Sequence, residues 1–156
     1  MNKLSPDQDF LARQTCILCA SYQHWTGLPL VEAVPDSADA VYQLFHASFA
    51  IVSHDTQANP IFNYANQQAL KLFGMSWDEF TRLPSRYSAE PMVRQDRADL
   101  LKRVTRDGYV DDYSGIRIAK DGRRFMIRNA TVWSLLDHEG VYCGQAALIN
   151  DWAPLA

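Results

Sequence analysis

Residues 51–80 hold the pattern that most restricts what this chain can fold into. A short apolar strand, a polar turn and a second apolar strand occupy 51–64. Asn66 then opens a helix that Gly74 ends, and Ser76 opens another short helix. Two paired strands followed directly by short helices favour a sheet that is covered by helices.

The rest of the chain adds helices before this segment and strands after it. The predicted elements are an amphipathic helix from Ser5 to His24, a helix capped by Asp36 or Ser37, a helix from Ala89 to Asp107 capped by Ser88, and strands over 113–119, 124–136 and 141–150. Their order predicts an α+β fold: a five-stranded antiparallel sheet with helices on one face, plus the N-terminal amphipathic helix. We expect a helical extension over 1–34 and a domain over 35–156.

Four short segments carry a resemblance to a known family. They are Phe-Asn-Tyr-Ala-Asn at 62–66, Leu-Pro-Ser-Arg-Tyr-Ser-Ala-Glu-Pro at 83–91, Gly-Arg-Arg-Phe at 122–125 and Gly-Gln-Ala-Ala at 144–147. On these segments the chain resembles the MEKHLA family, a PAS-related domain, and the order of its elements resembles a PAS domain. That family occurs as small free-standing bacterial proteins and at the C-terminus of plant homeodomain leucine-zipper transcription factors. Without a homeodomain or zipper, this chain resembles the free-standing type. The resemblance implies a sensory or interaction role and carries over no catalytic residue.

Composition restricts the classes of partner. A length of 156 residues fits one domain, and a net charge of −3 argues against a nucleic-acid binder or an anionic-membrane binder. No apolar run approaches the roughly 20 residues that span a bilayer, and the start of the chain has no signal-peptide core. Three cysteines form no disulfide framework, so we expect a protein of the reducing cytoplasm.

An Asp-Gly pair at 121–122 predicts a two-residue hairpin turn, which fixes the register of the strands around it. This register places Ile116, Ile118, Phe125, Ile127, Asn129, Thr131 and Trp133 on one face, toward the helices, with Ser114 opposite Asn129. Polar groups that converge on an apolar face are typical of a small-molecule pocket. The predicted ligand-binding residues are therefore Asn129, Ser114, Thr131 and Trp133, with Tyr64 from the second strand. In the alternative, Ser114 and Asn129 only bond each other.

The long helix carries a charged group beside its apolar stripe. Arg97 lies within the stripe of Val93, Leu100, Leu101 and Val104, and Glu90 and Arg94 fall on the same side. Because a buried charge needs a partner, an ion network is expected, which Arg86 on the preceding loop can join. The network either clamps the loop onto the sheet, with Glu90 and Arg94 as structural residues, or binds an anion through Arg97 and Arg86.

Other chemistry is weakly indicated. Cys16, Cys19 and His24 are too far apart along one helix to share a zinc ion, so no metal is expected. The position where flavin photoreceptors of the PAS class carry a reactive cysteine holds no cysteine, and the long helix has no histidine for haem. Asn66 is interpreted as a structural helix cap rather than a ligand contact.

The sequence therefore predicts a cytoplasmic sensory or interaction module, and not an enzyme, because no catalytic set is present. It would bind a small ligand or a protein partner in signalling, and the sequence does not identify the ligand or a cofactor. A homodimer formed through the N-terminal helix is expected. Two alternatives stay open: a homodimerisation module with a filled core, and a small α+β enzyme.

Overall fold

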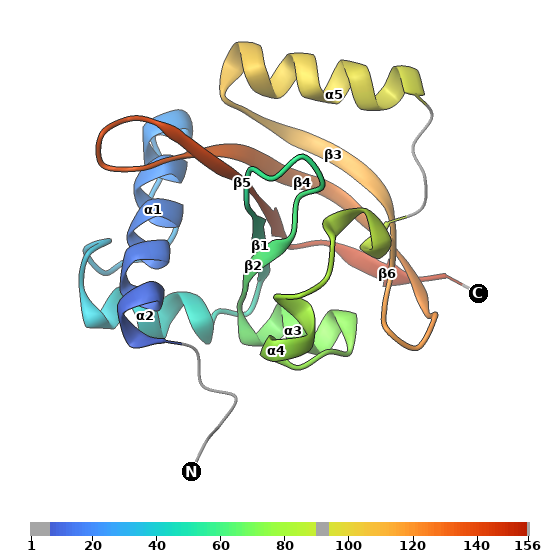
Figure 1. The fold of residues 1–156 in the computed structure, drawn as a ribbon, viewed down its shortest axis with the longest axis horizontal. Helices are drawn as coiled ribbons and strands as arrows, with labels where there is room; N and C mark the ends of the chain where they lie inside the picture. The colour runs from blue at the N-terminus through green and yellow to red at the C-terminus, as the bar shows by residue number, and fades with distance from the viewer. Residues whose placement is uncertain (1–6, 90–93, 156) are drawn as a thin grey trace.

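An antiparallel sheet of six strands forms the centre of the protein (Figure 1). The computed structural model describes residues 7–89 and 94–155, apart from the side chains of Arg94 and Arg97. The strand order is β2-β1-β5-β4-β3, and β6 pairs with β4. The elements are α1 (Gln8–Thr26), α2 (Ala38–Phe45), β1 (Ala50–His54), β2 (Phe62–Ala65), α3 (Gln67–Phe73), α4 (Trp77–Phe80), the 3-10 helix η1 (Ser85–Ser88), α5 (Arg94–Asp107), β3 (Tyr109–Ile118), β4 (Arg124–Leu136), β5 (Tyr142–Ile149) and β6 (Trp152–Pro154). The predicted α+β fold is confirmed, with β6 as a strand that the sequence pattern missed.

Local capping residues fix the helix boundaries that the sequence predicted. Ser37 caps α2, Asn66 caps α3 and Ser76 caps α4, each through its side chain. At α4 the cap is reciprocal, because Glu79 Oε1 accepts the backbone N–H of Ser76 while Ser76 Oγ accepts that of Glu79. Asp7 caps α1, and the predicted cap Ser5 lies outside the described residues.

The sheet has two covered faces. We call the face toward α3 and α4 the inner face, where Phe73 packs against Phe80 and Phe125 in a cluster that includes Ile127. The other, which we call the outer face, is covered by α1 and α2. Its buried cluster is Leu11, Leu18, Cys19, Leu44, Ile51, Tyr64, Trp133, Leu135 and Ala146. Figure 1 shows α1 and α2 on one side of the sheet, α3 and α4 on the other, and α5 beside β3.

Helix α1 is tied to the outer face by polar contacts as well as by its apolar side. Ser21 Oγ donates to the carbonyl of Leu136 at 3.2 Å and accepts its N–H at 2.9 Å. Trp25 Nε1 donates to the carbonyl of Ser134 at 2.8 Å. The prediction that this helix is amphipathic and docks is therefore confirmed, and the surface on which it docks is the sheet of its own chain.

The predicted hairpin register is wrong by one residue. Ile118 pairs with Arg124 and Arg117 pairs with Phe125. The turn is longer than expected, because the N–H of Ala119 donates to the carbonyl of Arg123 and leaves three residues in the loop. Gly122 adopts φ 89°, a left-handed conformation that suits such a three-residue turn. As a result Arg117 shares the inner face with Phe125, while Ile116 and Ile118 share the opposite one with Met126.

A bulge in β4 changes which later residues face the helices. Between the pairs Gly115–Ile127 and Tyr113–Ala130, β4 holds one residue more than β3, and Asn129 has φ 51°. Ala130 therefore follows Ile127 on the inner face, although strict alternation would place Asn129 there. Thr131 and Trp133 move to the outer face, so the predicted common face from Phe125 to Trp133 is wrong.

The long helix begins later than predicted. Ala89 is extended, with φ −136° and ψ 153°, and forms a bridge to Arg117. Ser88 is not a helix cap, because its hydroxyl donates to the carbonyl of Ser85 at 2.8 Å within η1. Within α5, Val104 is buried as expected, whereas Leu101 is 50% exposed.

A candidate ligand-binding cavity

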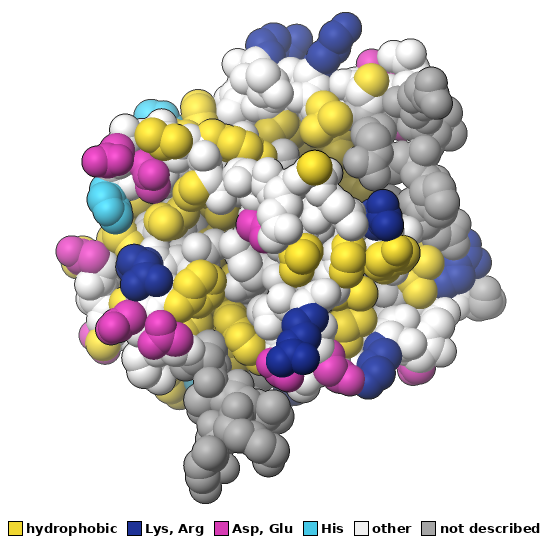
Figure 2. All heavy atoms as spheres, in the orientation of Figure 1, with side chains coloured by type: hydrophobic (Ala, Val, Ile, Leu, Met, Phe, Trp, Pro, Cys, Tyr) yellow, Lys and Arg dark blue, Asp and Glu magenta, His cyan; other side chains and the backbone are white. Residues whose placement is uncertain are grey.

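A cavity of about 970 Å³ lies over the inner face of the sheet. This volume falls at the upper end of the range of roughly 300–1,000 Å³ that small-molecule sites occupy. Its apolar wall comes mainly from the sheet and α5: Val52, Phe62, Phe73, Leu100, Leu101, Ile127, Val132, Ala147 and Ile149. In Figure 2 hydrophobic side chains gather on the face that carries η1 and the α3–α4 segment, with basic side chains among them. The cavity thus combines a large apolar wall with a few polar groups.

The segment from Leu83 to Ala89 roofs this cavity. At its start, the N–H of Phe62 donates to the carbonyl of Leu83 at 3.1 Å, and the N–H of Ser85 donates to the carbonyl of Pro60 at 2.9 Å. At its end Ala89 bridges to Arg117 of β3. Since β2 and β3 are the two ends of the main strand order, the segment crosses the sheet from one edge to the other. It holds η1 above the inner face.

Two arginines enter the cavity wall at the β3 side. Arg117 is half-buried, and its Nη1 donates to Ser88 Oγ at 3.3 Å while its Nη2 donates to Tyr113 Oη at 3.4 Å. Arg86 is exposed on η1, and its Nη2 donates to Tyr87 Oη at 2.9 Å. Among the residues that the structure describes, neither guanidinium has a carboxylate partner. This end of the cavity is therefore basic.

The far end of the cavity is polar. His54, Asn59, Tyr142 and Gln145 line it. The Nδ1 atom of His54 lies 2.8 Å from the carbonyl of Asp55, which accepts, so we assign a ring proton to Nδ1. The cavity thus has an arginine end and an imidazole–amide end, with the apolar wall between them.

Most of the predicted ligand-binding residues lie away from this cavity. Tyr64, Thr131 and Trp133 belong to the outer face, and burial raises the pKa of Tyr64 well above its ordinary value. Ser114 and Asn129 are exposed, and the backbone N–H of Asn129 donates to Ser114 Oγ at 3.3 Å. The positions of these five residues give no support to a common ligand site, and the alternative that Ser114 and Asn129 bond each other is closer to the observed contact.

Among the arginines of the predicted network, only Arg86 has a side chain that the structure describes. Glu90 and the side chains of Arg94 and Arg97 lie outside the described residues, so the ion network proposed for them stays a prediction. Arg86 lines the cavity, as the anion hypothesis requires. Arg117 is not among the predicted residues, because the predicted register put it on the other face of the strand, whereas the observed register places it opposite Phe125 on the buried side.

The buried side chain of Asn66 links neighbouring elements of the fold and does not line the cavity. Its side chain has no exposed surface, and Oδ1 accepts the N–H of both Ile51 and Ala69 at 3.1 Å. Its Nδ2 donates to the carbonyls of Leu44 and Phe49. All of its hydrogen-bonding capacity is used within the protein, as a structural role requires.

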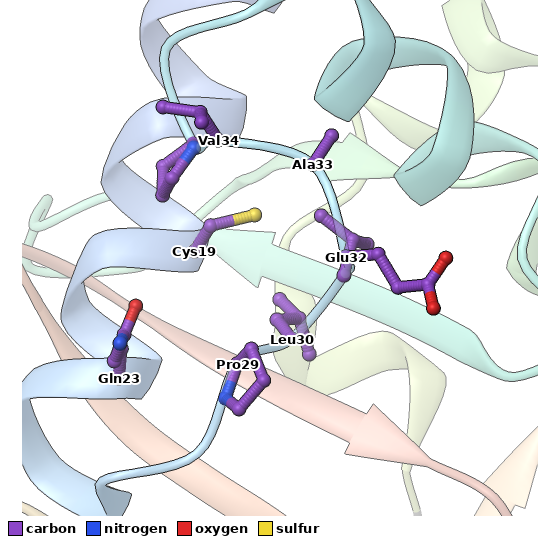
Figure 3. A pocket seen from close by; sticks show the side chains of 9 residues that line it. Cys19, Gln23, Pro29, Leu30, Glu32, Ala33 and Val34 are labelled. Carbon is purple, nitrogen blue, oxygen red and sulfur yellow. The ribbon is translucent and has the colours of Figure 1, made fainter.

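A second hollow, of about 190 Å³, lies between α1 and the loop over 29–35 (Figure 3). In this view the sulfur of Cys19 points toward the loop, while the carboxylate of Glu32 points away. Burial, and next the neighbouring Cys16, raise the pKa of Cys19 to about 12, so its thiol is unreactive at neutral pH. The hollow is smaller than ordinary ligand sites, and the carboxylate of Glu32, one of its few polar lining groups, points away from it. We therefore place the candidate site in the larger cavity.

The residues around the larger cavity do not fit a flavin that forms a cysteinyl adduct. Cys16 and Cys19 belong to α1 and Cys143 packs against the outer-face cluster, so all three thiols lie away from the inner face.

Among the described residues, no group of three or more His, Cys, Asp or Glu side chains is placed to hold a metal ion. No helix in the described part of the chain is long and apolar enough to cross a bilayer.

Comparison with protein families gives a match over nearly the whole chain. The family model of the MEKHLA domain matches residues 12–154. The chain belongs to the MEKHLA domain family. The match begins inside α1, so this MEKHLA domain includes most of the helix that covers the outer face.

Curated relatives of this MEKHLA domain are much longer proteins. It is 23% identical over 148 residues to the homeobox-leucine zipper protein ATHB-15 of Arabidopsis thaliana, an alignment that covers 94% of this chain and 17% of the relative. It is 24% identical over 147 residues to the homeobox-leucine zipper protein HOX9 of Oryza sativa, with 93% and 17% covered. The chain thus spans about one sixth of the length of the curated relatives that it matches.

Solved structures share the PAS fold. A PAS domain from Colwellia psychrerythraea superposes with a TM-score of 0.62 at 18% identity, covering 72% of this chain and 93% of that one. The photo-excited blue-light photoreceptor Vivid superposes with a TM-score of 0.58 at 20% identity, covering 86% and 94%. At this level of identity the likeness establishes the fold of this MEKHLA domain and nothing about its ligand.

Proposed function

We propose that this MEKHLA domain is a cytoplasmic sensory module that binds a small organic molecule over the inner face of its sheet and signals through protein contacts. The observation that carries the proposal is the cavity of about 970 Å³, with an apolar wall and polar groups at two ends. The filled-core alternative is not favoured, because such a core leaves no cavity of this size. The enzyme alternative has only the imidazole of His54 as a candidate general base, since no aspartate or glutamate lies among the described lining residues.

The outer face provides a route by which ligand binding in the cavity can affect a protein partner. Ser53 lines the cavity, and its hydroxyl accepts a hydrogen bond from Nε2 of Gln14 on α1 at 3.1 Å. Two buried polar atoms near this helix, Thr15 Oγ1 and Trp133 Nε1, have no hydrogen-bond partner among the residues that the structure describes. Unsatisfied buried groups weaken the docking of α1, which makes this helix the element that a bound ligand can shift. The predicted homodimer would form through the exposed side of the same helix.

A neutral fluorescent probe tests whether the cavity binds small molecules. N-phenyl-1-naphthylamine brightens when it leaves water, so the wild-type protein should enhance its emission in a saturable way. Ala147 lies on the cavity wall, and Ala147→Trp should fill the space and abolish the enhancement. The matched control is Val141→Trp, which adds the same ring at a residue 56% exposed on the β4–β5 turn and should leave binding intact. Equal enhancement by both variants would refute the proposal.

A further inference from the structure

We propose that the ligand is an organic acid whose carboxylate is bound by Arg117 and Arg86 and whose apolar body lies on the inner face. The inference rests on the proposed function and names the class of its ligand. It starts from the charge of the cavity. Two arginines and no aspartate or glutamate stand among the described lining residues, although the whole chain carries a net charge of −3. The basic character is therefore specific to this site.

Within the part of the chain that the structure describes, the contacts of Arg117 leave most of its hydrogen-bonding capacity unused. A guanidinium has five N–H donors, and the two bonds that Arg117 makes, at 3.3 and 3.4 Å, are longer than ordinary N–H···O bonds. Both acceptors are neutral hydroxyls, of Ser88 and Tyr113. A half-buried guanidinium without an anion is incompletely compensated, because its charge is partly removed from water. A planar carboxylate accepts two parallel bonds from such a fork and supplies the missing charge.

The surroundings of Arg117 position it for a ligand rather than for solvent. The hydroxyl of Ser88 that it contacts is itself oriented by donation to the carbonyl of Ser85. Its backbone is fixed by the bridge to Ala89 and by the pair with Phe125. Arg86 stands exposed on the roof and can attract an anion at long range, although water screens it more strongly. We assign binding chiefly to Arg117, and attraction of the acid to Arg86.

The apolar wall sets the rest of the ligand. Ile127, Val132 and Ile149 line the inner face between the arginine end and the far end. An acid with a hydrophobic chain or ring therefore fits better than a small, fully hydrated anion. The site provides apolar surface for the body of a ligand and a single basic end that sets the orientation of that ligand.

Matched acids and amides test this inference directly. The probes are decanoate with decanamide, and 4-phenylbutanoate with 4-phenylbutanamide, each titrated against the bound N-phenyl-1-naphthylamine at pH 7.5. Both acids should displace the dye at concentrations about tenfold or more below their amides, because charge-assisted hydrogen bonds to arginine are stronger than neutral ones. Equal displacement by acid and amide, failure of both acids, or equally effective displacement by inorganic phosphate would overturn the proposal.

Arginine variants locate the interaction. Arg117→Met should weaken binding of decanoate about tenfold or more and leave the amide unchanged, and Arg117→Lys should recover part of the loss by restoring charge without the planar fork. Arg86→Met should cause a smaller loss that disappears at high salt. The control is Arg128→Met, which removes an exposed arginine that pairs with Asp151 outside the cavity and should change nothing. Unchanged acid binding in Arg117→Met would refute the assignment.

The dye separates failure of this inference from failure of the proposed function. N-phenyl-1-naphthylamine is uncharged, so its binding depends on the cavity and not on the arginines. If the dye binds and the acids do not compete, the cavity stands and the acid is rejected. If the dye itself fails to bind the wild-type protein, the proposed function and the inference fall together. Retained dye binding in Arg117→Met also shows that this variant is folded.

Discussion

Replacing Asn66 by alanine should destabilise the protein far more than the loss of an ordinary helix cap. Its Oδ1 accepts the N–H of Ile51 in β1 and of Ala69 in α3, both at 3.1 Å. Its Nδ2 donates to the carbonyls of Leu44 and Phe49, at 3.1 and 2.8 Å. One fully buried side chain therefore joins the end of α2, the approach to β1 and the start of α3.

The expected magnitude follows from these contacts. A buried hydrogen bond contributes about 1 kcal/mol net, and a buried group left without a partner costs about 1–3 kcal/mol. Losing four such bonds should lower the free energy of unfolding by about 4 kcal/mol, out of the 5–15 kcal/mol typical of a domain. For a chain of this length the melting temperature should fall by about 8–16 °C.

Urea unfolding followed by tryptophan fluorescence measures this loss, since Trp133 is fully buried. The control is Ser76→Ala, which removes the exposed cap of α4 and should cost about 1 kcal/mol. The difference between the two variants isolates the bonds that Asn66 makes beyond its own helix. A loss for Asn66→Ala no greater than that for Ser76→Ala would refute the reasoning.

Three other outcomes are expected. Gly144→Ala should lower the free energy of unfolding in urea by about 3 kcal/mol or more, because its Cβ would lie 2.4 Å from the carbonyl oxygen of His54. The control Gly140→Ala, in open space at φ 78°, should lower it by about 1–2 kcal/mol. Equal losses in the two variants would contradict this. Removing residues 1–34 should expose the outer face, so the truncated protein should melt lower and bind more hydrophobic dye, and sedimentation of the full chain should show a dimer that the truncation loses; a monomeric full chain would reject the dimer. Partial burial works to raise the pKa of Asp55, yet hydrogen bonds from Ile61 and Gln57 outweigh it and lower that pKa. Its stabilising contribution should therefore be present above pH about 4 and be lost as pH falls, and Asp55→Asn should reduce this dependence in acid-unfolding curves.

Features set by neighbouring residues were predictable from the sequence. Gln67–Phe73 and Trp77–Phe80 have the boundaries expected, because each cap bonds to a backbone N–H three residues away. The docking of α1 was predictable too, since its apolar residues recur at helical spacing. The surface on which it docks was not predictable, because this spacing shows that one side of the helix is buried and does not show which surface covers it.

The residues of the site were harder to predict, because the face on which a strand residue lies depends on the number of residues in each preceding turn and bulge. One residue more in the turn at Gly122 moved Arg117 to the inner face. One residue more at Asn129 moved Trp133 to the outer face. A strand has a period of two, so each single-residue change inverts every assignment beyond it. Asn129 gave a weak signal, because asparagine tolerates the left-handed conformation better than most residues.

The segment over 83–89 connects the family resemblance to the cavity through backbone geometry. Its bonds to Pro60 and Phe62 anchor it at β2, and its bridge to Arg117 anchors it at β3. A span between opposite edges of a sheet needs a chain of fixed length and shape, which a proline, a 3-10 turn and an extended end together provide. The same turn brings Arg86 and the Ser88 hydroxyl to the arginine of β3. One of the four segments that carry the family resemblance is thus the one that roofs the cavity and completes its basic end.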